Sequence, residues 1–126
     1  MADSTKRVFV LILLSVLLGA GGQLLMKSGM TSIGKIEVSQ LLSSTLFQVV
    51  FNPMIIFGLS LYGIAAVIWL VVLSRAELSY AYPMVAMGYI ITSVSAWILF
   101  NENMTLLRFL GITLIVSGVY LISLKI

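Results

Sequence analysis

Four long apolar segments, separated by short polar stretches, occupy most of this 126-residue chain. About 20 apolar residues in a helix cross the roughly 30 Å hydrocarbon core of a bilayer. Hydrophobic residues make up 61% of the chain, more than a soluble domain of this size could bury. We therefore predict an all-α membrane protein, a single domain over residues 1–126 with transmembrane helices at about 8–27, 53–74, 78–100 and 105–125.

The segment between the first two spans has a different pattern. In residues 38–51, apolar positions recur at helical spacing while serine and glutamine occupy much of the rest. This pattern is typical of an amphipathic helix that lies in the membrane interface. Asn52 and Pro53 then mark a break, because the residue before proline disfavours helix and proline suits a first helical turn.

The basic residues give only a weak orientation. An even number of spans places both termini on one side, and that side carries four basic residues against three on the other. This bias favours cytoplasmic termini in a multi-pass protein of the cell (inner or plasma) membrane. It leaves open that the chain inserts both ways and pairs as an antiparallel dimer. The first group is Lys6, Arg7, Arg75 and Lys125, and the second is Lys27, Lys35 and Arg108.

The residue types argue against catalysis. The chain has no cysteine and no histidine, which removes thiolate nucleophiles, imidazole bases and the usual zinc ligands. Glu77 and Glu102 fall on opposite membrane faces, and no phosphate-binding glycine loop is present. The basic residues are too scattered for a nucleic-acid surface. We expect no catalytic residue, metal or cofactor, and we expect a protein that moves a ligand across a bilayer instead of an enzyme.

Gln23 and Lys27 form the first candidate site. They lie one helical turn apart on the same face, after Gly19 and Gly22, which let a helix or a ligand approach the backbone closely. Glutamine offers both a donor and an acceptor within an apolar span. The alternative is an interhelical hydrogen bond with no ligand.

The third span begins with Tyr80 and Tyr82, followed by Pro83, which removes a backbone donor near the membrane surface. The two tyrosines are candidates for substrate binding, and equally for an interfacial aromatic belt. Pro83 and Gly88 are candidates for bending this span. Arg108 and Lys125 are interpreted as interfacial anchors.

On the last span, Gly111 and Gly118 are seven residues apart and lie near one helix face. Small residues in such a stripe favour close helix packing, and we expect them to serve self-association.

The chain resembles the four-helix members of the drug/metabolite transporter superfamily, which include the small multidrug resistance proteins. The resemblance is carried by the end of the first span, by Ala81-Tyr82-Pro83-Met84, and by the Gly111 to Gly118 spacing. Small multidrug resistance proteins have a membrane-embedded glutamate in the first span, where this chain has Gly19. This departure counts against proton-coupled drug export.

A closer similarity is to the subunits that flip aminoarabinose-phosphoundecaprenol, through Gly22-Gln23-Leu24, Lys27, the Ala81 to Met84 motif and Glu102. It implies a flippase for a polyprenyl-phosphate-linked sugar, acting as a homodimer or with a related small subunit. Lys27 would then contact the phosphate. The sugar would be contacted by Gln23, Tyr80 and Tyr82, and its amino group by Glu102. The alternatives are an exporter of small molecules or cationic drugs with the same fold, and a non-transporting scaffold subunit.

Overall fold

The computed structural model describes the backbone of residues 2–124 and the side chains of residues 6–124. Within that part of the chain every regular element is a helix, and four helical segments are long and apolar enough to span a membrane, which confirms the predicted fold class. The segments are Lys6–Ile33, Pro53–Arg75, Leu78–Phe100 and Leu106–Ser123. In chain order the elements are α1 (Ala2–Ile33), η1 (Val38–Leu42), α2 (Thr45–Val50), α3 (Pro53–Arg75), α4 (Leu78–Met84), α5 (Met87–Phe100) and α6 (Leu106–Ser123).

Helix α1 is longer than the apolar segment that it contains. It continues past Lys27 to Ile33, and Gly34, at a φ of 97°, ends it. The polar residues of this extension are compatible with helix because their hydroxyls bond back to the preceding turn, as in Thr31 Oγ1 to the Lys27 carbonyl at 2.8 Å. At 1.5 Å per residue, the apolar stretch 8–26 measures about 28 Å, close to the hydrocarbon thickness. Lys27 therefore lies at the hydrocarbon boundary, and the last turns of α1 reach into the headgroup layer.

Residues 38–51 form two short helices, η1 and α2, where a single interfacial helix was expected. The break falls at Ser43, whose hydroxyl donates to the Gln40 carbonyl at 2.6 Å and competes with continued helix. Large apolar side chains remain exposed on both pieces, among them Leu42 of η1 and Phe47 of α2. Both pieces are therefore suited to the interface, at the level where α1 leaves the hydrocarbon.

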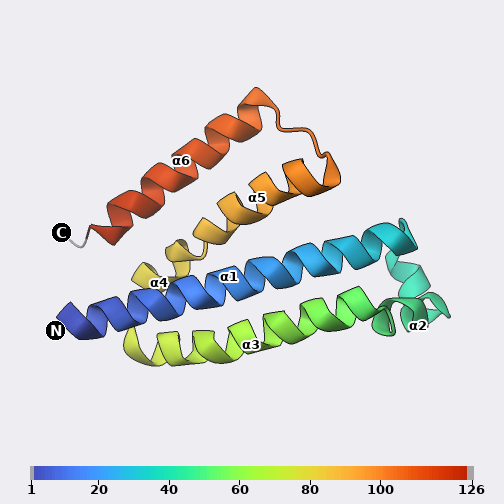
Figure 1. Ribbon diagram of the computed structural model, residues 1–126, viewed down its shortest axis with the longest axis horizontal. Helices are drawn as coiled ribbons and strands as arrows, with labels where there is room; N and C mark the ends of the chain where they lie inside the picture. The colour runs from blue at the N-terminus through green and yellow to red at the C-terminus, as the bar shows by residue number, and fades with distance from the viewer. Residues whose placement is uncertain (1, 125–126) are drawn as a thin grey trace.

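Helices α1 and α3 form the most tightly packed pair. The predicted break at Asn52 is the start of α3, where Asn52 Oδ1 accepts from the backbone N–H groups of Met54 and Ile55. Further along, Gly22 and Gly58 face each other so closely that a Cβ on Gly22 would lie 2.6 Å from the Gly58 carbonyl oxygen. The buried Ser15 hydroxyl also donates to the Ala65 carbonyl at 2.9 Å. Figure 1 shows the two helices running alongside each other over most of their length.

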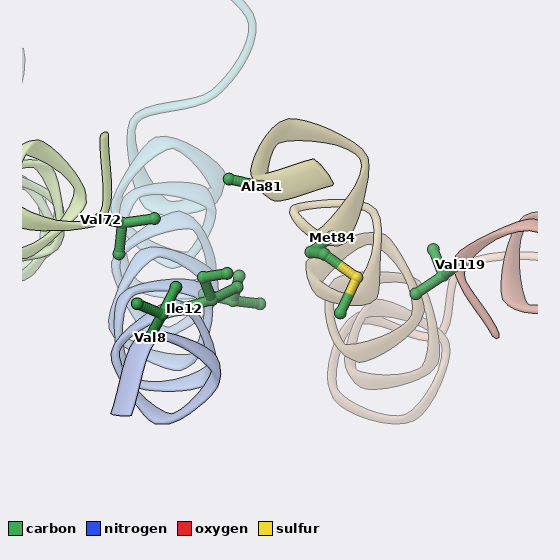
Figure 2. Close-up of a cluster of buried hydrophobic side chains, with 7 residues drawn as sticks. Val8, Ile12, Val72, Ala81, Met84 and Val119 are labelled. Atoms are coloured by element: carbon green, nitrogen blue, oxygen red, sulfur yellow. The ribbon is translucent and has the colours of Figure 1, made fainter. Parts of the chain in front are cut away.

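The third span is divided into α4 and α5 by the turn at Val85 and Ala86. Pro83 cannot donate a backbone hydrogen bond, and the helix ends one residue later. Next to this break lies a buried cluster that joins α1, α3, α4 and α6 (Figure 2). Its members are Val8, Ile12, Val16, Val72, Ala81, Met84 and Val119. The helix is thus interrupted between Pro83 and Gly88, and the role of these two residues in bending stays a prediction.

Helix α6 returns toward the termini and packs against α4 and α5 (Figure 1). A Cβ added to Gly111 or to Gly118 would meet nothing within 4 Å. These two glycines therefore do not serve packing within the described chain, and their surface is open.

Candidate functional site

A lysine from the first span meets an acid from the turn after the third. Lys27 Nζ lies 3.7 Å from Glu102 Oε1, and the two side chains are 54% and 43% exposed. The pair joins α1 to the turn between α5 and α6, at the end of the molecule opposite the termini. In Figure 1 this turn and the far end of α1 both lie on the right.

The position of Glu102 depends on the residue before it. Asn101 has a φ of 52°, and the backbone N–H of Asn101 bonds to the Ala96 carbonyl, which ends α5. Asparagine tolerates this left-handed conformation better than most side chains do. The chain therefore reverses directly after α5, and Glu102 is held near Lys27.

Arg108 adds a second cation beside Glu102. Thr105 caps α6 by accepting from the Arg108 backbone N–H, and the Arg108 guanidinium donates through Nη1 to the Asn103 carbonyl at 2.7 Å. Glu102, Asn103 and Arg108 together line a pocket of about 390 Å³. Trp97 of α5 and Gly111 of α6 also line it. We call this pocket the polar pocket.

The electrostatics of this region follow from two cations and one carboxylate. Lys27 and Arg108, set against the single carboxylate of Glu102, give this region one net positive charge. An anion that also carries an ammonium group complements this arrangement, because it meets a cation and the acid together. Among the described residues no group of three or more acidic side chains is placed to hold a metal ion.

Gln23 lies on the exposed face of α1, one turn before Lys27, whereas Gly22 is buried. Gly22 packs on α3, and Gly19 approaches the same helix, since a Cβ added to it would lie 3.9 Å from the Ala65 Cβ. The two glycines thus serve the contact between α1 and α3, while Gln23 and Lys27 stay accessible to a ligand.

The structure does not bring Tyr80 and Tyr82 to this site. Both belong to α4, near the N-terminal half of α1, at the opposite end of the spans from Lys27 and Glu102 (Figure 1). Tyr80 is partly buried against the core, and Tyr82 is 65% exposed. A small ligand between Lys27 and Glu102 would not reach them in this conformation.

Sequence reasoning missed two features of this region. Arg108, which was interpreted as an interfacial anchor, also lines the polar pocket with Glu102. Its place three residues after Thr105, a typical helix-capping residue, is the signal that fixes it in the first turn of α6. Gly58, which meets Gly22, was also missed, and no local pattern marks it.

The comparisons with known proteins identify curated relatives of this chain. No family model matches the chain, and no solved structure matches it. Among the curated relatives, the "Probable 4-amino-4-deoxy-L-arabinose-phosphoundecaprenol flippase subunit ArnF" of Serratia proteamaculans is 35% identical over 113 residues, 86% of each chain. The subunit named ArnE, of Salmonella newport, is 30% identical over 119 residues, covering 90% of this chain and 95% of its own. This chain therefore belongs to the family of the 4-amino-4-deoxy-L-arabinose-phosphoundecaprenol flippase subunits.

Proposed function

We propose that this protein is one subunit of a flippase that moves a polyprenyl-phosphate-linked amino sugar across the inner (plasma) membrane, with cytoplasmic termini. The observation that carries the proposal is the ion pair between Lys27 and Glu102, with Arg108 beside it, at the depth where lipid headgroups lie. The names of the relatives, which are flippase subunits for aminoarabinose-phosphoundecaprenol, support it.

The charges of the site match the two ends of such a headgroup. The phosphate carries negative charge and meets Lys27, while the amino group of the sugar is cationic and meets Glu102. Gln23, one turn before Lys27, is placed to contact the sugar through both a donor and an acceptor. The hydrocarbon tail stays in the bilayer while the headgroup crosses.

The ion pair is weak enough to be exchanged for substrate. Pairs between exposed charges contribute about 0–1 kcal/mol, and both Lys27 and Glu102 are roughly half exposed. A headgroup that brings its own anion and cation replaces this pair with two new ones. Binding therefore opens the contact between α1 and the turn after α5 at little cost in free energy.

The same observations favour a flippase over a drug exporter of this fold. The four acidic residues are Asp3, Glu37, Glu77 and Glu102, and none of them lies in the middle of a span. Proton exchange through a membrane-embedded carboxylate has no group here to carry it. Assembly with a second small subunit, identical or related, is part of the proposal, because the relatives are named as subunits.

The test is headgroup translocation in proteoliposomes that contain a labelled polyprenyl-phosphate-linked amino sugar. The chain is reconstituted alone and with a related subunit. Lys27→Ala should reduce the initial rate at least tenfold, because a charge-assisted contact to phosphate is lost. Lys35→Ala is the matched control: it removes the same charge from the same membrane side, outside the site, and should leave the rate unchanged.

Glu102→Gln separates recognition of the amino group from recognition of the phosphate. This substitution should slow translocation of the lipid-linked amino sugar but not of the same lipid with its amine acetylated, because only the free amine pairs with the carboxylate. Full transport by Lys27→Ala would overturn the phosphate role. Uptake of quaternary cations driven by a pH gradient would indicate a drug exporter of the same fold. Transport of neither the lipid-linked sugar nor the cations would indicate a non-transporting scaffold subunit.

A further inference from the structure

A second groove lies between α5 and α6, of about 300 Å³. Its walls are apolar side chains, among them Ile90 and Val94 of α5 and Phe109 and Val116 of α6. Thr113 also lines it, but its hydroxyl donates to the Phe109 carbonyl at 2.9 Å within the same helix. We call this the apolar groove.

The apolar groove adjoins the polar pocket. Trp97, Met104 and Ile112 line both. We call the two together the slot. Its walls are charged at the end with Glu102 and Arg108 and apolar toward Ile115 and Val116. From Arg108 to Val116 the slot descends about 12 Å along α6, which is close to half the thickness of the hydrocarbon core.

The charged end of the slot is prepared for an anion. One guanidinium N–H of Arg108 is bonded to the Asn103 carbonyl, which fixes the side chain, and four further N–H donors remain on the group. A guanidinium presents such donors to phosphate as a planar fork, and fixing it beforehand lowers the ordering cost of binding. An anion here lies at headgroup depth and directly above an apolar channel.

We infer that this slot binds one polyprenyl-phosphate lipid lengthwise, with the phosphate at Arg108 and the first part of the hydrocarbon chain in the apolar groove across Trp97. The inference rests on the proposed function and adds the site that holds the carrier. The slot is charged at the end near the membrane surface and apolar at the end inside the bilayer. An amphiphilic lipid has the same arrangement. The phosphate at Arg108 is the one that Lys27 meets from the side of α1, so the two cations flank it, while Glu102 meets the amino group of the sugar.

Trp97 reports on this slot. The chain has two tryptophans, and Trp69→Phe, which keeps an aromatic side chain against the core, leaves Trp97 as the sole tryptophan. The variant is reconstituted in phosphatidylcholine vesicles and titrated with a polyprenyl phosphate brominated in its first isoprene units. We expect saturable quenching of Trp97 at low mole fraction. Brominated polyprenol without phosphate and brominated phosphatidylcholine should quench only in proportion to their amount.

Two pairs of variants locate the binding. Arg108→Gln should raise the half-saturating mole fraction at least tenfold, and Lys35→Gln, which removes a charge outside the slot, should leave it unchanged. Gly111→Leu should narrow the polar pocket and so weaken binding, and the backbone has room for the change because a Cβ at Gly111 meets nothing within 4 Å. Gly63→Leu is the control on α3, where the added Cβ also meets nothing within 4 Å.

Equal quenching by brominated phosphatidylcholine and by polyprenyl phosphate would overturn the inference, because it would show bulk lipid in the groove. Shielding of Trp97 from every lipid, together with a crosslink from Trp97 to a second copy, would also overturn the inference, because a subunit would then occupy the apolar groove. Binding in the slot without headgroup translocation would support this inference and refute the proposed function. Translocation that is insensitive to Arg108→Gln and Gly111→Leu would refute the slot alone.

Discussion

Substituting Gly22 with alanine should destabilise the protein through the contact between α1 and α3. The added Cβ would lie 2.6 Å from the Gly58 carbonyl oxygen and 3.2 Å from the Tyr62 backbone nitrogen, whereas ordinary contacts begin near 3.4 Å. Both neighbours are backbone atoms, so no flexible side chain can move away. The two helices must separate locally by roughly 0.8 Å, and overpacking of this kind costs about 1–3 kcal/mol.

Gly63→Ala on α3 isolates this steric effect. Its added Cβ meets nothing within 4 Å, so the substitution changes helix propensity alone, which favours alanine by up to about 1 kcal/mol. The same propensity gain applies to Gly22→Ala. The difference between the two variants is therefore the overpacking cost, about 1–3 kcal/mol, or roughly 5- to 150-fold in the unfolding equilibrium.

The assay is reversible unfolding of the purified protein in bicelles with increasing sodium dodecyl sulfate, followed by circular dichroism. Gly22→Ala should unfold at lower detergent fraction than the unmodified chain, and Gly63→Ala at an equal or higher one. Equal stabilities for the two variants would refute the reasoning, because they would show that α1 and α3 do not approach as closely as Gly22 and Gly58 indicate.

Three further outcomes are expected. Ser15→Ala should destabilise the protein by about 0.5–1 kcal/mol in the same assay, because the buried hydrogen bond to the Ala65 carbonyl is lost. An unchanged stability would show that this hydrogen bond contributes nothing. Asn52→Ala should cost about 1 kcal/mol and speed amide hydrogen exchange in the first turn of α3, where protection equal to the unmodified chain would contradict the cap. Gly118→Leu should leave the fold intact but weaken subunit association measured by energy transfer between labelled chains, and an unchanged oligomer would exclude this face of α6.

The four spans and the start of α3 were predictable because they depend on local properties. Hydropathy over about 20 residues identifies a span wherever the helix packs, and Asn52 followed by Pro53 acts through its own backbone. The family was predictable for a related reason, since its short motifs lie within single segments.

Other features depend on where a helix lies relative to its neighbours. The end of α1 was placed at residue 27, because Ser28, Thr31 and Ser32 suggest a loop, yet their surroundings favour helix. Ser32, for example, accepts a hydrogen bond from Asn52 Nδ2 at 3.4 Å, a contact between segments that are distant in sequence.

The predicted site was only partly assembled for the same reason. Lys27 and Glu102, which were both predicted to contact the headgroup, lie together. Tyr80 and Tyr82, which were predicted to contact it too, lie at the other end of the spans. Whether Arg108 faces lipid headgroups or a pocket depends on how α5 and α6 pack, which hydropathy does not report. The roles of these residues in binding stay predictions.

The left-handed backbone conformation of Asn101, an uncharged residue, controls how far Glu102 lies from Lys27. The carboxylate reaches Lys27 because one backbone dihedral, a φ of 52°, directs the chain back across the end of α5. Glycine adopts this dihedral freely, whereas a β-branched residue such as valine disfavours it. The spacing between acid and lysine can thus be altered at residue 101 alone, leaving the net charge of +3 and every ionisable group as they are.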